Sequence, residues 1–189
     1  MSVLIVIPAR MQATRLPGKP LAEIGGVPMI VQVWRRAMEA GVGDVVVACD
    51  GEEIARAVRA AGGVAVVTDP DLPSGSDRVW EVVASRQSPV ASEIIINLQG
   101  DLPTFEPHLL KDLLVPLQNP AVDIATLVAE ITRAEEHENP SVVKAVLSFE
   151  PRVPSHEPRI ARALYFTRLP APYGDGARYH HIGVYAYRR

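Results

Sequence analysis

The stretch "VLIVIPARMQATRLPGKP", from Val3 to Pro20, decides the fold. It opens on a continuous run of β-branched residues and leucine, which is typical of a strand buried on both faces of a parallel sheet. The loop that follows carries Arg10, Arg15 and Lys19 and contains no acid. Because ligands bind beyond the carboxyl ends of the strands in such sheets, we expect this loop to lie at a ligand site.

Strands and helices alternate downstream of this run. Helical periodicity and apolar runs predict strands at 44–49, 64–68 and 93–98 and helices at 28–41, 50–63, 74–86 and 107–117. Asp50 and Glu53 have the spacing of a capping box, and Pro116 is expected to end the last of these helices. The alternation predicts an α/β fold with a doubly wound, mostly parallel, Rossmann-like sheet.

The second half of the chain has a different pattern. Strand-like segments with little helix between them cover 122–131, 141–149, 159–166 and 180–188, and 149–160 reads as a proline-rich loop. We expect a mixed-sheet excursion here. The length suits a single domain over residues 1–189, divided into parts of about 1–120 and about 121–189.

Bulk composition narrows the function classes. A net charge of −3 argues against a general nucleic-acid or membrane binder, so the clustered cations indicate a local site. Cys49 is the only cysteine, which excludes an internal disulfide and fits a reducing cytoplasm. The first apolar run is too short for a signal peptide, and no run has the length of a membrane span.

The basic loop has the chemistry of a phosphate site. Arginine offers a planar fork to phosphate oxygens and lysine a point charge, while Gly18 permits a tight turn before Lys19. The loop is not a Walker A motif, because Pro20 follows Lys19 and no partner glycine precedes it, nor is it a dinucleotide-binding fingerprint. The alternative is a solvated basic loop with no ligand.

Six segments, spread along the whole chain, resemble one enzyme family. They are "IPARMQATRLPGKPLAEIGGVPMI" (7–30), "SGSDR" (74–78), "NLQGDLP" (97–103), "NPSVVKAV" (139–146), "ALYFTR" (163–168) and "HHIGVYAYR" (180–188). Together they resemble the 3-deoxy-manno-octulosonate (KDO) cytidylyltransferases, also called CMP-KDO synthetases. The first motif is shared in weaker form with sialic-acid cytidylyltransferases.

The resemblance implies a reaction. In that family the anomeric hydroxyl of KDO attacks the α-phosphate of CTP, which yields CMP-KDO for lipopolysaccharide assembly and releases pyrophosphate. It further implies a Mg²⁺ cofactor, a cytoplasmic homodimer, CTP and KDO as substrates, and no nucleic-acid or membrane partner. The first part of the chain would bind the nucleotide, and the second would bind the sugar and form the dimer.

The resemblance also implies site residues for the phosphates and the metal. Arg10 and Lys19 match positions that hold the triphosphate, and Asp101 matches the metal-binding aspartate, so these three are the candidate catalytic residues. Further residues of the basic loop are candidates for substrate binding: Pro8, Ala9 and Arg15. Without the family, an aspartate after a strand is more often a turn former or a helix cap.

Cytosine and ribose recognition is implied for a second group. Ser74, Gly75 and Arg78 match the family's loop around the base, and Gln99 matches a position at the nucleotide. The alternative for the loop is a helix start with Ser76 as its cap, and both can hold, because a helix N-terminus offers free N–H donors.

KDO carries a carboxylate and many hydroxyl groups, so its pocket should mix basic and hydrogen-bonding side chains. His181 and Tyr185 are four residues apart in a predicted strand and share a face, and Arg168 could pair with a carboxylate. Alternatively, Tyr185 and Tyr187 are ordinary sheet residues and His180 is simply exposed. Lys144 could face either side of its strand.

Two departures from the family bear on activity. Leu102 stands where the family often has an acid, beside the retained Asp101. The family pattern also continues past the position of Arg189 with a segment that supplies a second metal aspartate. We therefore expect residues 1–189 to be a truncated version of a longer protein that binds CTP and turns over poorly. The alternative functions are a CTP-binding, catalytically incomplete fragment and CMP transfer to a sialic-type nonulosonic acid.

Overall fold

The computed structural model describes residues 1–12, 17–85, 92–149 and 160–189. Contacts within the chain divide it into two compact units. The first comprises residues 1–125 together with 184–189, and the second comprises residues 126–183. The first unit thus includes the last six residues of the chain. The division at about residue 120 that the sequence suggests would have placed them in the second part.

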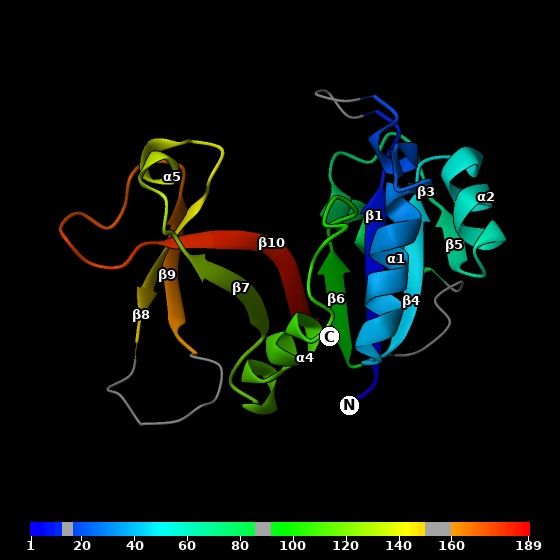
Figure 1. The fold of residues 1–189 in the computed structure, drawn as a ribbon. Coiled ribbons are helices and arrows are strands. Elements are labelled where there is room, and N and C mark those ends of the chain that lie inside the picture. The colour runs from blue at the N-terminus through cyan, green and yellow to red at the C-terminus, as the bar shows by residue number, and fades with distance from the viewer. Residues whose placement is uncertain (13–16, 86–91, 150–159) are drawn as a thin grey trace. The chain divides into compact units, whose positions relative to one another are not determined.

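A parallel sheet forms the centre of the first unit (Figure 1). Its parallel strands are β1 (Val3–Ala9), β4 (Asp44–Cys49), β5 (Val64–Val67) and β6 (Ile94–Leu98). They lie in the order β5-β4-β1-β6, and residues 184–188 of β10 (Tyr179–Arg188) pair antiparallel with β6. Every residue of β1 is buried, as its apolar sequence predicts.

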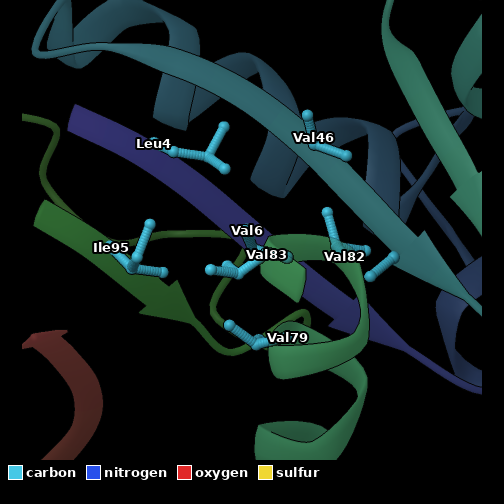
Figure 2. Close-up of a cluster of buried hydrophobic side chains, with 8 residues drawn as sticks. Leu4, Val6, Val46, Val79, Val82, Val83 and Ile95 are labelled. Carbon is cyan, nitrogen blue, oxygen red and sulfur yellow. The ribbon is translucent and has the colours of Figure 1, made fainter. Parts of the chain in front are cut away.

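Helices flank this sheet. They are α1 (Met29–Ala40), α2 (Glu52–Ala60), α3 (Gly75–Ala84) and α4 (Leu109–Leu114), with the short 3-10 helices η1 (Lys19–Leu21) and η2 (Pro116–Gln118). Figure 2 shows Val79, Val82 and Val83 of α3 gathered with side chains of β1, β4 and β6 into a buried cluster. Leu4 and Val6 belong to this cluster, so alternation along β1 directs Ile5 and Ile7 to the opposite face.

The other face of the sheet is covered by α1. Ile30 of α1 and Ile7 of β1 both lie within 3.6 Å of the position that a Cβ on Gly100 would occupy. Figure 1 shows α1 lying lengthwise against β1 and β4. Because helices cover both faces of a mostly parallel sheet, the prediction of a doubly wound α/β fold is confirmed.

The second unit is built mainly of strands. It contains most of β7 (Ile124–Glu130), α5 (Ala134–Glu138), β8 (Lys144–Ser148), β9 (Arg162–Thr167) and the first half of β10. β8 pairs antiparallel with both β9 and the start of β10. Lys144 is fully buried on β8, and its Nζ donates to the carbonyl of Asn139 at 2.7 Å.

Several local predictions differ from the structure. The capping box is wrong: the N-cap of α2 is Gly51, which makes no side-chain cap, and Asp50 Oδ2 instead accepts a hydrogen bond from the Met11 N–H. Sequence reasoning also missed α5 and the hairpin of β2 (Glu23–Ile24) and β3 (Val27–Pro28), whose two-glycine turn was a usable signal. Pro116 does follow the end of α4, as predicted.

No helix in the described parts of the chain combines the length and the apolar character needed to cross a membrane.

Candidate active site

A cavity of about 490 Å³ opens at the carboxyl ends of β1 and β6 in the first unit. Its volume falls within the range of sites that hold a small ligand. The chain passes from β1 to β4 on one side and later to β6 on the other, so the cavity lies where the strand order reverses. Its lining is Pro8, Ala9, Arg10, Lys19, Pro20, Met29, Leu72, Ser74, Gly75, Arg78, Gln99, Gly100 and Asp101.

Close backbone approach brings the two strand ends together. A Cβ on Gly100 would lie 2.8 Å from the carbonyl oxygen of Pro8, closer than real Cβ atoms come, so only glycine fits there. This approach places Asp101, three residues after β6, beside the residues that follow β1. Asp101 and Arg10 thus line one cavity at the same edge of the sheet.

Arg10, Lys19 and the Asp101 carboxylate line one part of the cavity. Arg10 directly follows β1, and Lys19 begins η1 after Gly18, which has the left-handed φ of 71°. Lys19 Nζ lies 2.8 Å from Asp101 Oδ2. The two side chains are 36% and 52% exposed, so both remain accessible to a ligand that enters the cavity. Arg15 lies outside the described residues.

Asp101 alone offers too few oxygen atoms to hold Mg²⁺, so a bound phosphate would have to supply further oxygen ligands. Among the described residues, no group of three or more histidine, cysteine, aspartate or glutamate side chains comes together. Magnesium prefers oxygen ligands and is often held by one or two carboxylates and substrate phosphates. Asp101 fits that arrangement, because it lines a cavity that also carries the cations Arg10 and Lys19.

The N-terminus of α3 forms another wall of the cavity. Ser74 is its N-cap: the Oγ accepts a hydrogen bond from the Asp77 N–H at 3.2 Å and donates to Asp77 Oδ2 at 2.5 Å. The helix start predicted for this loop is therefore present, with Ser74 rather than Ser76 as the cap. A helix N-terminus provides unpaired N–H groups and a partial positive charge, both of which favour an anionic ligand.

Arg78 lines the cavity and also supports its wall. The side chain is buried, and its Nη1 donates to Thr68 Oγ1 and, at 3.1 Å, to the carbonyl of Asp69. Thr68 in turn donates to the carbonyl of Cys49 at 3.0 Å. These bonds tie α3 to the residues that follow β5 and, through Thr68, to the last residue of β4, so Arg78 holds the cavity wall in place.

Gln99 is oriented by a buried polar chain. Its Nε2 donates to Asn97 Oδ1 at 3.1 Å, and Asn97 Nδ2 donates to Ser76 Oγ at 3.4 Å. Asn97 is fully buried, so its amide has little freedom. The Gln99 Oε1 atom lies near Gly75 at the cavity wall. Sequence reasoning overlooked Asn97, although a polar residue inside the apolar run "IIINL" was a signal.

Comparison with known proteins decides the family. The cytidylyltransferase family model matches residues 4–189. The chain belongs to the cytidylyltransferase family. Curated relatives include the 3-deoxy-manno-octulosonate cytidylyltransferases of Parvibaculum lavamentivorans, 62% identical over 186 residues, and Paramagnetospirillum magneticum, 58% identical over 186 residues. Each match covers 98% of this chain, and 70% and 74% of the two relatives.

Solved structures agree with this assignment. The chain is similar to a CMP:2-keto-3-deoxy-manno-octonic acid synthetase complexed with CTP, with a TM-score of 0.86 and 42% identity over 100% of this chain and 74% of the other. A 4-diphosphocytidyl-2C-methyl-D-erythritol synthase from Anaerococcus prevotii has a TM-score of 0.60 at 10% identity and shows a shared fold alone.

The sugar-site candidates of this cytidylyltransferase fall in both units. In the second unit, His181 Nε2 lies 3.0 Å from Thr126 Oγ1, and its ring packs 4.6 Å from that of Phe166. Arg168 Nη1 donates to the carbonyl of Pro140 at 2.8 Å. Tyr185 belongs to the first unit, outside the lining of the 490 Å³ cavity, and stacks against Tyr187 with ring centroids 5.9 Å apart.

Burial shifts the titration of these side chains. It lowers the pKa of His181, and neighbouring His180 lowers it further, so the imidazole favours its neutral form. Burial raises the pKa of the Tyr185 phenol. Burial also raises the pKa of Tyr187, where Tyr185 adds to the effect and a hydrogen bond with Asn97 opposes it. A neutral imidazole and a protonated phenol can each donate and accept hydrogen bonds.

Proposed function

We propose that this chain transfers CMP from CTP to the anomeric hydroxyl of KDO, which forms CMP-KDO and releases pyrophosphate. The sugar nucleotide would serve lipopolysaccharide assembly. The carrying observation is the cavity at the strand crossover that unites Arg10, Lys19 and Asp101 in a chain 62% identical to a 3-deoxy-manno-octulosonate cytidylyltransferase. The likeness to a CTP-bound synthetase supports the choice of nucleotide.

In the proposed reaction, the protein positions the reactants and neutralises charge. Nucleotidyl transfer needs little covalent help from side chains, because charge builds up on the phosphate oxygens and on the leaving pyrophosphate. Arg10 and Lys19 would hold the triphosphate, with Lys19 leaving Asp101 to do so. Magnesium, when bound to Asp101 and phosphate oxygens, would supply further charge neutralisation. The N-terminus of α3 adds positive potential on the opposite wall.

The base would be read by the polar wall that Ser74, Gly75 and Gln99 form. The Gln99 amide is held by Asn97, so a ligand meets a fixed pattern of hydrogen-bonding groups. We assign sugar binding in the second unit to Arg168 and His181. The guanidinium of Arg168 suits the KDO carboxylate, and neutral His181 suits hydroxyl groups.

A homodimer is the proposed assembly. Large apolar side chains are exposed on and after β9 in the second unit: Leu164, Tyr165, Phe166, Leu169 and Tyr173. Exposed apolar patches mark protein contacts, which supports a second copy as the partner. The cytoplasm is the proposed location of this protein, because CTP is the proposed substrate.

Pyrophosphate release tests this proposal and separates it from its alternatives. The protein is incubated with CTP, magnesium chloride and KDO, and pyrophosphate and CMP-KDO are quantified over time. Release that requires KDO supports the proposal. CTP binding without release would identify a binding-only fragment, and release with a sialic acid but not with KDO would change the acceptor sugar.

A further inference from the structure

Asp50 stands at the carboxyl end of β4, one strand away from the basic loop. Cys49 and Ala9 are register partners at the ends of β4 and β1, so Asp50 lies level with the start of that loop. Its Oδ2 accepts a hydrogen bond from the Met11 N–H at 2.9 Å. Its Oδ1 is buried and has no hydrogen-bond partner within the described part of the chain.

The hydrogen bond to Met11 continues into the cavity. Met11 offers its carbonyl to the Gly18 N–H at 3.0 Å, which joins the two ends of the basic loop. Gly18 then precedes Lys19, and its own carbonyl accepts from Leu21 at 2.9 Å to close η1. A continuous path of bonds therefore runs from the Asp50 carboxylate through Met11 and Gly18 to the residue that carries the Lys19 ammonium.

The same anchor fixes Arg10. This residue lies between Ala9, which the sheet holds, and Met11, whose N–H the Asp50 carboxylate holds. The half-buried location of Asp50 shields this hydrogen bond from water. Arg10 and Lys19 thus both emerge from backbone that the Asp50 carboxylate anchors.

We propose that Asp50 is a positioning residue that anchors the phosphate-binding loop and aims Arg10 and Lys19 at the triphosphate. Asp50 does not line the cavity and does not cap α2, so neither ligand contact nor helix capping accounts for it. The inference rests on the proposed function, since it assigns the loop to CTP. Its core is the bond between the Asp50 carboxylate and the Met11 N–H.

Three substitutions at Asp50 separate geometry from charge. Asp50→Asn keeps an acceptor oxygen in the same place without the charge. Asp50→Glu keeps the charge and displaces the carboxylate by one methylene. Asp50→Ala removes both. Asp44→Ala is the matched control, because Asp44 is an exposed acid at the other end of the same strand.

CTP affinity by calorimetry and hydrogen exchange of the Met11 amide by NMR are the readouts. We expect Asp50→Ala and Asp50→Glu to weaken CTP binding about tenfold or more, which corresponds to about 1.4 kcal/mol. The CTP affinity of Asp50→Asn should stay within about threefold of that of the parent. The CTP affinity of Asp44→Ala should equal that of the parent. Exchange of the Met11 amide should accelerate in the Ala and Glu variants alone.

Several results would overturn the proposal. CTP affinity of folded Asp50→Glu equal to that of the parent would do so, as would an Asn variant as weak as the Glu variant. An unchanged rate of hydrogen exchange at the Met11 amide in Asp50→Glu would also overturn the proposal, and this measurement needs no nucleotide. If the parent failed to bind CTP, the proposed function would fall, while Met11 exchange would still decide whether Asp50 anchors the loop. The Glu and Asn pair decides the matter even if Asp50→Ala does not fold.

Discussion

Lys19 Nζ lies 2.8 Å from Asp101 Oδ2, so the cation proposed for the triphosphate and the carboxylate proposed for magnesium are paired with each other. Both side chains are partly exposed, and pairs of this kind stabilise a fold by only about 0–1 kcal/mol. Lys19 and Asp101 can therefore separate easily when each meets a partner that binds it more strongly. A magnesium–nucleotide complex offers a cation to Asp101 and phosphate oxygens to Lys19 at the same time.

This pairing predicts opposite effects on nucleotide and metal. Lys19→Ala should weaken CTP binding or slow turnover by about a hundred- to a thousandfold, because a preorganised phosphate donor is lost. In the absence of nucleotide, the same change should strengthen the binding of Mn²⁺, used as a spectroscopic probe for Mg²⁺, since Asp101 no longer has a competing cation. Calorimetry and electron paramagnetic resonance measure the two affinities.

Asp101→Asn is the matching control for the metal. It should weaken Mn²⁺ binding in the presence of CTP while leaving the fold intact, because the side chain is exposed. Normal CTP affinity together with normal turnover in Lys19→Ala would remove the basic loop from the mechanism.

The choice of nucleotide should depend on the polar wall that Ser74, Gly75 and Gln99 form. CTP should bind more tightly than ATP or GTP, because a wall shaped to a pyrimidine leaves too little room for a purine. Asn97→Leu should reduce discrimination between CTP and UTP, because the freed Gln99 amide can rotate to suit either exocyclic group. Calorimetric titration with the four nucleotides tests this, and ATP binding as tightly as CTP would contradict the assignment.

Ser74 should contribute to both stability and ligand binding. Ser74→Ala removes the N-cap of α3 and should lower the free energy of unfolding by about 1 kcal/mol. Ser74→Thr keeps the hydroxyl and should retain most of that stability. Urea denaturation of the three proteins compares them, and an alanine variant as stable as the parent would show that the cap contributes nothing.

His181 should make stability depend on pH. Its pKa in the folded protein lies below the usual 6.5, so the unfolded chain binds more protons in the interval between the two values. Stability should therefore fall as the pH drops through 6.5 toward the folded pKa. Denaturation midpoints at several pH values measure this, and His181→Gln should flatten that part of the profile. An NMR titration that placed the His181 pKa above 6.5 would reverse the expectation.

Sequence alone predicted the sheet of the first unit because its signals are local. Apolar runs predict the strands β1, β4 and β6, and amphipathic periodicity predicts the helices. Because Arg10 and Asp101 follow the ends of parallel strands, they are expected at one edge of the sheet. The site was predictable to that extent. Family resemblance supplied the remaining nucleotide-site candidates, and the described ones among them line the same cavity.

The structure added contacts that no local pattern encodes. The spacing of Asp50 and Glu53 matches a capping box, but the Met11 N–H, in the loop after the neighbouring strand β1, donates to the Asp50 carboxylate instead. Arg78 lines the cavity as the resemblance implies, and its guanidinium also donates to Thr68 and Asp69, which the sequence did not indicate. Both contacts join segments that only the folded chain brings together.

Magnesium-dependent pyrophosphate release tests the central claim most directly. The parent and Asp101→Asn proteins are compared at equal concentration with CTP and KDO across a magnesium titration, with a sialic acid replacing KDO in a parallel series. The account predicts release by the parent that rises with magnesium and requires KDO, and release reduced by about a hundredfold or more in Asp101→Asn. Release that is equal in the two proteins, or that does not depend on KDO, would contradict it.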